Sequence, residues 1–93
     1  MLFEWNPTKA ERNQRKHGVS FREAMEVFRD PLSVTFSDRD RSDEEDRFLI
    51  IGLSLSRNVL VVAHTYRDDH IRIISARLAT KQERAFYVHT TRH

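Results

Sequence analysis

The sequence predicts an α+β fold with the element order β-α-α-β-β-β-β-α. Three apolar runs between residues 47 and 76 are separated by short polar turns, a pattern typical of an antiparallel meander. Two helix-start signals precede this region, and a third follows it. The 93 residues, 39% of them hydrophobic, suit a single domain, residues 1–93, around one modest core. We therefore expect a compact antiparallel sheet with helices packed on one of its faces.

The N-terminal elements should be a short strand and a surface helix. Residues 2–5 alternate weakly and are expected to form the strand. Asn6 can cap a helix, and Pro7 suits the first helical position. The helix should run to about His17, because Gly18 is a good C-terminal residue. Its sequence is nearly all polar, so it should lie on the surface.

A second helix should follow and form part of the core. Ser20 and Glu23 have the spacing of a capping box, and Asp30-Pro31 should end the helix. Its apolar stripe consists of Phe21, Ala24, Met25 and Phe28.

The remaining elements are four strands and a last helix. The expected strands are residues 32–36, 47–55, 59–66 and 70–76. The charged stretch 37–46 should be a loop or hairpin end, and the run 47–55 is apolar enough to be covered on both faces. Thr80 and Glu83 form another capping box, before a helix from about residue 81 to 90.

The charge is unevenly distributed. The net charge is +2, but six of the 14 acids and only two of the 16 bases lie in residues 38–46. The rest of the chain therefore has a surplus of six bases, and most bases are arginines, which suit bidentate phosphate contacts. This balance favours a polyanion partner, although an Arg-rich soluble surface would look the same. The acidic stretch itself is a solvated turn, a guard against edge pairing or a contact for a basic partner.

Several classes of protein are excluded. The chain has no cysteine, so it has neither disulfides nor thiolate metal sites. It has no apolar segment long enough to span a membrane and no signal-peptide pattern, so we expect a cytoplasmic protein without membrane association. It also lacks the glycine-rich phosphate loops of nucleotide-binding proteins and the Gly-x-Ser-x-Gly motif.

The densest group of polar side chains lies in residues 64–87. RNA cleavage without a metal needs a proton acceptor, a proton donor and cations that stabilise the charged transition state. Arginines can supply the charge, and His64 or Glu83 could move protons. Tyr87 could stack on a base, bind a phosphate or assist proton transfer.

Each of these residues also has a structural explanation. Arg72 could pair with an acid on a neighbouring strand, and Arg77 could cap backbone carbonyls. Glu83 is explained by its capping box, Tyr87 could be a core aromatic, and His64 could be an ordinary buried histidine.

Two further groups are less specific. His64, Asp68, Asp69 and His70 could be drawn as a metal site, but their spacing matches no known ligand pattern and the two aspartates suit a hairpin turn. We therefore expect no metal and no other cofactor. Lys16 and His17 either complement the C-terminal end of their helix or reach a phosphate.

Several segments together resemble one family. Residues 3–7 resemble its opening, with Asn6 in place of the usual acid, and residues 16–21 resemble its most recognisable run, after Lys9 and Asn13. Further matching segments are 23–24, 27–31, 47–52, 60–62 and 72–77, with Ala79, Glu83, Arg84 and Tyr87. The sequence is thus similar, over nearly its whole length, to the BrnT toxins of type II toxin–antitoxin systems.

The resemblance implies a RelE-like fold and a metal-independent endoribonuclease that inhibits translation. It also implies a BrnA-type antitoxin that neutralises the toxin, with operator DNA bound only through the antitoxin complex. The alternative is a module without catalysis, either an antitoxin-binding co-repressor or an RNA-binding domain.

The resemblance also suggests residues for the site. It implies that Arg77 and Arg84 hold the scissile phosphate, that Arg72 positions the RNA backbone and that Tyr87 assists. His64 is a candidate for proton transfer. The expected RNA-binding residues are Lys16, His17 and Arg67.

Overall fold

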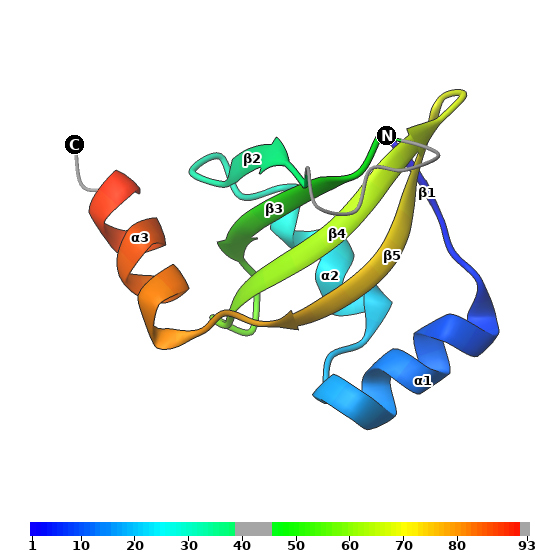
Figure 1. Cartoon of the computed structure of the whole chain (residues 1–93), viewed down its shortest axis with the longest axis horizontal. Helices are drawn as coiled ribbons and strands as arrows, with labels where there is room; N and C mark the ends of the chain where they lie inside the picture. Colours follow the sequence, from blue (N-terminus) through cyan, green and yellow to red (C-terminus); the bar gives the residue numbers. More distant parts are fainter. Residues whose placement is uncertain (39–45, 92–93) are drawn as a thin grey trace.

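Five strands form one mixed sheet in the order β1-β5-β4-β3-β2 (Figure 1). The computed structural model describes residues 1–38 and 46–91. The strands are β1 (Leu2–Glu4), β2 (Val34–Ser37), β3 (Phe48–Leu53), β4 (Val59–Arg67) and β5 (His70–Leu78), and the helices are α1 (Pro7–His17), α2 (Phe21–Val27) and α3 (Lys81–Thr91). The predicted α+β class and element order are confirmed. Most of the predicted charged loop, residues 37–46, lies outside the described residues.

The sequence predicted an antiparallel sheet, but one pair of strands in the sheet is parallel. Strands β3 to β5 form the predicted antiparallel meander, and β2 pairs with β3 in the same way. Strand β1, however, pairs with β5 in parallel, with Phe3 opposite Ile71. A tight turn imposes an antiparallel pairing only on consecutive strands. Strand β1 is separated from β5 by most of the chain, so no turn dictates its direction.

The helices lie on both faces of the sheet, not on one. Ile50, Leu60 and Val62 pack with α2 in the larger core cluster. Ile51 and Val61 point the other way and pack with Tyr87 of α3. Successive strand residues face opposite sides of a sheet, so the continuous apolar run of β3 is covered on both faces, as its composition predicted. In Figure 1, β4 crosses in front of α2, and α3 stands at the far end of the sheet from α1.

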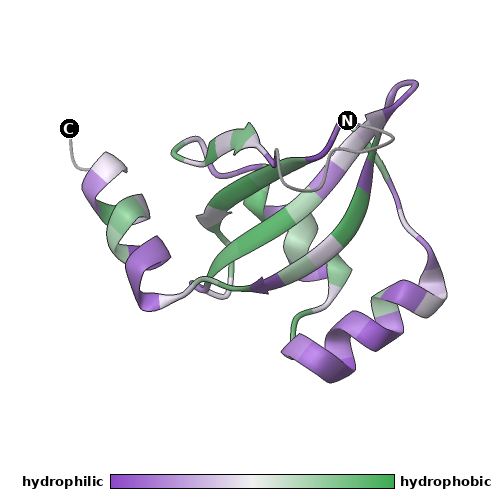
Figure 2. Ribbon diagram, viewed as in Figure 1, coloured by the Kyte–Doolittle hydropathy of each residue, from purple (hydrophilic) through white to green (hydrophobic). Residues whose placement is uncertain are grey.

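The predicted helix signals are largely confirmed. The Asn6 side chain accepts hydrogen bonds from Thr8 N and Lys9 N, and Gly18 ends α1 with a left-handed φ of 71°. Helix α1 is mostly hydrophilic and lies beside β5, as expected (Figure 2). Helix α2 ends at Val27, a few residues before the proline that was expected to end it. Within the described ranges, no helix has the length and apolar composition needed to cross a membrane.

Only half of the first predicted capping box forms. The Ser20 hydroxyl accepts a hydrogen bond from Glu23 N at 3.0 Å. The Glu23 carboxylate does not return to the helix start. Instead it accepts hydrogen bonds from Ser54 Oγ at 2.7 Å and Asn58 Nδ2 at 3.0 Å, and so ties α2 to the β3–β4 turn.

Candidate nucleic-acid interface

Three polar residues of β5 lie on one face of the sheet. Their partners on β4 are Thr65 for Arg72, Ala63 for Ser75 and Val61 for Arg77. These partners are two residues apart along β4, so Arg72, Ser75 and Arg77 share a face. A bulge opposite Ala63 and His64 makes this possible, because it adds one residue to β5 between Arg72 and Ser75.

A basic groove lies between α1 and β5. It has a volume of about 290 Å³, and Ile74 and Ser75 form its β5 wall. The α1 wall is formed by Lys9, Arg12, Asn13, Lys16 and His17. These positions recur every three or four residues, so the cations project from one side of the helix. Among the residues that the structure describes, no salt bridge engages Lys9, Arg12, Lys16 or His17. The groove therefore offers positive charge that the protein itself does not neutralise.

Asn13 fixes this helix against the strand. The residue is 7% exposed. Asn13 Nδ2 donates to Ala76 O at 2.8 Å and to Val19 O at 3.0 Å, and Ala76 N donates to Asn13 Oδ1 at 3.1 Å. Strand β1 pairs only with residues 70–72 of β5, so the Asn13 carboxamide takes the place of a neighbouring strand at Ala76. The position of the basic groove thus depends on one buried amide.

Replacing Asn13 by alanine should lower the free energy of unfolding by about 2–3 kcal/mol, because buried backbone groups of Ala76 and Val19 lose their partner. Urea unfolding followed by circular dichroism measures this. The matched control is Gln14→Ala, which removes an exposed amide from the same helix and should change stability by less than about 0.5 kcal/mol. Equal effects for the two variants would show that Asn13 is not the fixing contact.

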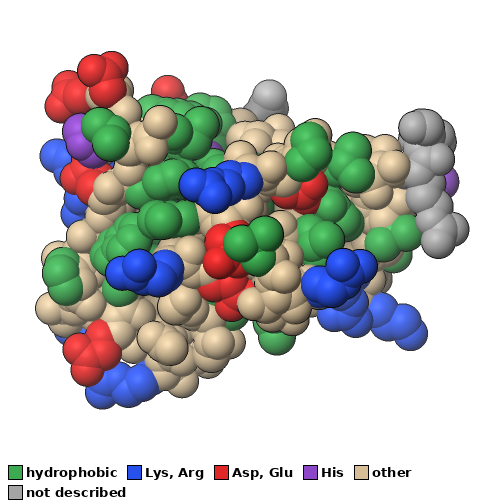
Figure 3. Space-filling view, turned by 180° about the vertical axis from the view of Figure 1, so that it is seen from behind, with side chains coloured by type: hydrophobic (Ala, Val, Ile, Leu, Met, Phe, Trp, Pro, Cys, Tyr) green, Lys and Arg blue, Asp and Glu red, His purple; other side chains and the backbone are tan. Residues whose placement is uncertain are grey.

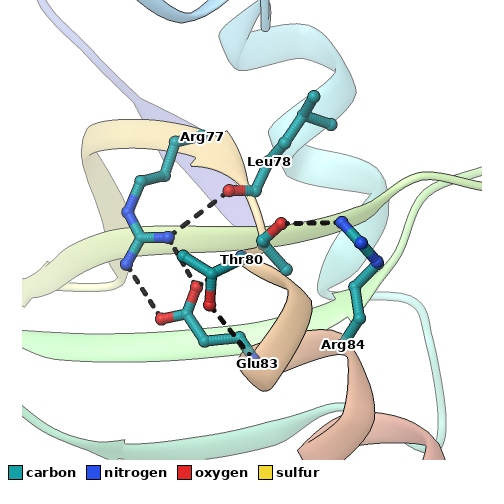
Figure 4. Close-up of polar contacts among 6 residues, drawn as sticks. Arg77, Leu78, Thr80, Glu83 and Arg84 are labelled. Carbon is teal, nitrogen blue, oxygen red and sulfur yellow. Dashed lines mark hydrogen bonds and ion pairs between the residues drawn. The ribbon is translucent and has the colours of Figure 1, made fainter.

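Arg72 and Arg77 both have carboxylate partners. Arg72 Nη1 donates to Glu4 Oε2 at 3.0 Å, between the paired strands β5 and β1. Arg77 binds Glu83 through two parallel hydrogen bonds, of 2.7 and 3.0 Å (Figure 4). The second capping box is complete, since Glu83 also accepts from Thr80 N and its own N–H donates to Thr80 Oγ1. The contacts of Arg72 therefore agree with the structural explanation, in which this arginine pairs with an acid on a neighbouring strand.

This ion pair shifts the pKa of both partners. The hydrogen bond from Arg77 outweighs burial and, with the Thr80 contacts and the charge of Arg77, lowers the pKa of Glu83 from 4.5 to about 2. The hydrogen bond to Glu83 raises the pKa of Arg77. Arg77 keeps 39% of its side-chain surface exposed, so solvent can still reach its guanidinium.

The lowered pKa predicts an acid-sensitive contribution to stability. A carboxylate with a depressed folded-state pKa stabilises the fold above its unfolded pKa, and this contribution is lost as the pH falls from about 4.5 to about 2. After allowance for solvent screening at this partly exposed pair, we expect a loss of about 1–2 kcal/mol. Thermal unfolding of the wild type and Glu83→Gln across this range checks it. An equally steep loss in Glu83→Gln would assign the acid sensitivity to other groups.

Arg84 and Tyr87 also make contacts within the protein. Arg84 Nη1 donates to Ala79 O at 3.1 Å, and in Figure 4 Arg77 and Arg84 lie on opposite sides of Thr80. Tyr87 is 7% exposed and donates its hydroxyl hydrogen bond to Asp30 Oδ2 at 2.5 Å. Burial and this hydrogen bond raise the pKa of Tyr87 to about 12. Tyr87 thus anchors α3 to the sheet, as a core aromatic would.

His64 lies inside the larger core and is 0% exposed. Its ring contacts Phe28 with centroids 4.8 Å apart, and its Nδ1 donates to Val62 O at 3.2 Å. Burial lowers the pKa of His64, although the hydrogen bond to Val62 opposes this. Proton transfer to RNA by His64 would require the core to open. Its Nε2 has no hydrogen-bond partner within the described part of the chain.

The predicted RNA-binding residues divide between two places. Arg67 is exposed at the β4–β5 turn, whereas Lys16 and His17 line the basic groove. The described residues contain no group of three or more side chains arranged to hold a metal ion. Lys16 and His17 thus lie together in the groove. Arg72 and Arg77 lie on the same sheet face as Ser75, which lines that groove.

Four residues of the groove were not predicted as site residues from the sequence: Lys9, Arg12, Asn13 and Ser75. The spacing of Lys9, Arg12 and Lys16 at three and four residues did carry a signal. It shows a basic stripe on a helix that was predicted to be polar and exposed. Ser75 carried no signal, because only the packing of α1 against β5 makes it part of a groove.

The comparisons agree with the resemblance seen in the sequence. Residues 5–83 match the family described as "Ribonuclease toxin, BrnT, of type II toxin-antitoxin system". The crystal structure of the Brucella abortus ribonuclease toxin BrnT superposes with a TM-score of 0.67 and 21% sequence identity, covering 87% of this chain and 99% of that one. At this identity the likeness establishes the fold. A search among curated proteins found no match.

Proposed function

The chain belongs to the BrnT family of ribonuclease toxins of type II toxin–antitoxin systems, and we propose that it cleaves RNA without a metal ion in the groove between α1 and β5. Cleavage in the cytoplasm would inhibit translation, and a BrnA-type antitoxin would neutralise the toxin. Operator DNA would be bound only through that complex.

The observation that carries this proposal is the unneutralised charge of the groove. Lys9, Arg12 and Lys16 line it together with His17, and none of them forms a salt bridge with another described residue. A phosphodiester backbone is the polyanion that such a row of cations attracts. The arginines of the β5 face have carboxylate partners already, so the α1 cations are better placed to receive the first phosphate.

The groove also holds a group that can move protons. Histidine exchanges protons near neutral pH, and His17 lies among the cations, unlike the buried His64. In the proposed reaction His17 takes the proton of the ribose 2′-hydroxyl, and the 2′-oxygen attacks phosphorus. The bond to the 5′-oxygen breaks, and that oxygen takes a proton from Lys16. The products are a 2′,3′-cyclic phosphate and a 5′-hydroxyl end, and Arg12 and Lys9 stabilise the charged transition state.

Arg77 extends the proposed RNA path along β5. It lies two residues beyond Ser75 on the same face, and its partly exposed guanidinium can bind a second phosphate beside Glu83. Arg72 lies on the same face, on the other side of Ser75 along β5. We assign Arg84 and Tyr87 a supporting part, because their polar groups hold α3 in place.

The test is cleavage of a 5′-labelled RNA by the purified chain in excess chelator. The wild type should produce fragments with 2′,3′-cyclic ends, and Arg12→Ala/Lys16→Ala should cut at least tenfold more slowly. The matched control is Arg15→Ala, which removes a cation of the same helix that pairs with Glu11 outside the groove. Absence of cleavage by folded wild-type protein would favour a binding module without catalysis. Cleavage that chelator abolishes would overturn metal independence.

A further inference from the structure

A second groove lies on the rear of the molecule, between α2, β1 and the β3–β4 turn. It has a volume of about 280 Å³, and its apolar wall includes Phe3, Met25 and Leu55. Leu55 is 76% exposed and Met1, which also lines the groove, is 84% exposed, so the apolar wall faces solvent. Figure 3 shows this rear face, where hydrophobic side chains lie between basic and acidic ones.

Two arginines and one glutamate line this groove. Arg22 lies in α2, and Arg29 lies two residues beyond the C-terminal end of that helix. Both are exposed, and neither forms a salt bridge with another described residue. The carboxylate between them, Glu26, accepts a hydrogen bond from Leu55 N at 2.9 Å and is thus engaged within the protein. The groove therefore combines an apolar wall with two arginines that form no salt bridge with a described residue, and its one carboxylate is hydrogen-bonded within the protein.

We propose that this groove, here called the α2 groove, docks an acidic amphipathic segment of the cognate antitoxin. The proposal rests on the proposed function, in which a protein antitoxin neutralises this toxin. Apolar residues of the segment would contact Phe3, Met25 and Leu55, and its carboxylates would meet Arg22 and Arg29. Methionine adapts to the shape of a partner, and arginine is enriched at the centre of protein interfaces.

A protein segment fits this surface better than RNA. An RNA backbone needs a row of cations, as in the α1–β5 groove, whereas the α2 groove has two arginines beside a carboxylate, Glu26, and apolar side chains. The α2 groove also lies on the sheet face opposite Arg72, Ser75 and Arg77. The antitoxin can therefore anchor on α2 without occupying the β5 face.

The experiment measures binding of the purified antitoxin from the same operon by titration calorimetry. Arg22→Glu/Arg29→Glu should weaken binding at least tenfold, and the wild-type affinity should fall with added salt. Leu55→Asp tests the apolar part independently and should also weaken binding at least tenfold. The matched control is Arg15→Glu/Lys81→Glu, which makes the same change of charge at two exposed positions outside the α2 groove and should bind like the wild type. Thermal unfolding checks that each variant is folded.

Wild-type affinity in Arg22→Glu/Arg29→Glu would overturn the proposal, as would an equal loss in the control pair. The same variants are assayed for RNA cleavage without antitoxin, which should be unchanged. Loss of RNA binding with intact antitoxin binding would assign the groove to RNA and also overturn it. A wild type that binds antitoxin through Arg22 and Arg29 but cuts no RNA would leave the docking surface standing and refute only the ribonuclease mechanism.

Discussion

His17→Ala should cleave RNA at least a hundredfold more slowly than the wild type, because a positioned general base contributes about 10²–10⁴ to the rate. The substitution leaves Lys9, Arg12 and Lys16 in the groove, so RNA affinity should change by less than about threefold. The chemical step would be lost while binding is kept. Single-turnover cleavage with a labelled RNA, together with a binding titration, separates these two quantities.

The pH dependence makes this prediction specific. A general base must be unprotonated to accept a proton, so wild-type cleavage should rise with pH, and His17→Ala should lack this rise. The matched control is His89→Ala, which removes an exposed histidine of α3 and should cleave at the wild-type rate. If His17→Ala kept its rate while Arg77→Ala lost it, the reaction would be centred at the β5–α3 junction.

The sequence predicted local features of this fold better than the spatial relations between its elements. The caps of α1 and α3 depend on residues within a few positions of each other, and they form as expected at Asn6 and at Thr80 with Glu83. The parallel pairing of β1 with β5 joins residues almost seventy positions apart, such as Glu4 and Arg72, and has no local signature. The placement of α3 against Ile51 and Val61 is a long-range choice of the same kind.

The same distinction holds for the candidate site. Lys16 and His17 were identified from the sequence, and both line the groove. The position of that groove on β5 depends on the contact between Asn13 and Ala76, which are 63 residues apart. It also depends on a bulge that no residue type signals in the sequence. The sequence could not show whether His64 is buried. A histidine in an apolar strand gives the same sequence pattern whether it lies in the core or faces a substrate.

Asp30→Ala should destabilise the protein by about 3–5 kcal/mol, because one partly buried carboxylate loses three hydrogen bonds and leaves their donors without a partner. Asp30 accepts from Leu32 N at 2.9 Å, from Leu53 N at 2.8 Å and from Tyr87 Oη at 2.5 Å. It thereby connects the end of α2, strand β3 and helix α3. For a domain of this size, the midpoint of thermal unfolding should fall by about 15–25 °C.

Tyr87→Phe separates the structural and catalytic explanations of Tyr87. It removes only the hydrogen bond to Asp30 and should cost about 1–2 kcal/mol. If Tyr87 only anchors α3, the folded variant should cut RNA at close to the wild-type rate. A large loss of cleavage with little loss of stability would instead place the hydroxyl in the reaction.

The pH dependence of stability gives a second measure of the same contact. Burial raises the pKa of Asp30, but the hydrogen bonds from Tyr87, Leu53 and Leu32 together lower it below 3.8. This contribution is present above pH 3.8 and is lost as the pH falls through the lowered folded-state value. Asp30→Asn keeps the shape but not the charge, so its stability should vary less with pH in this range than that of the wild type. Parallel curves for the two proteins would mean that the charge of Asp30 contributes nothing to holding α3 on the sheet.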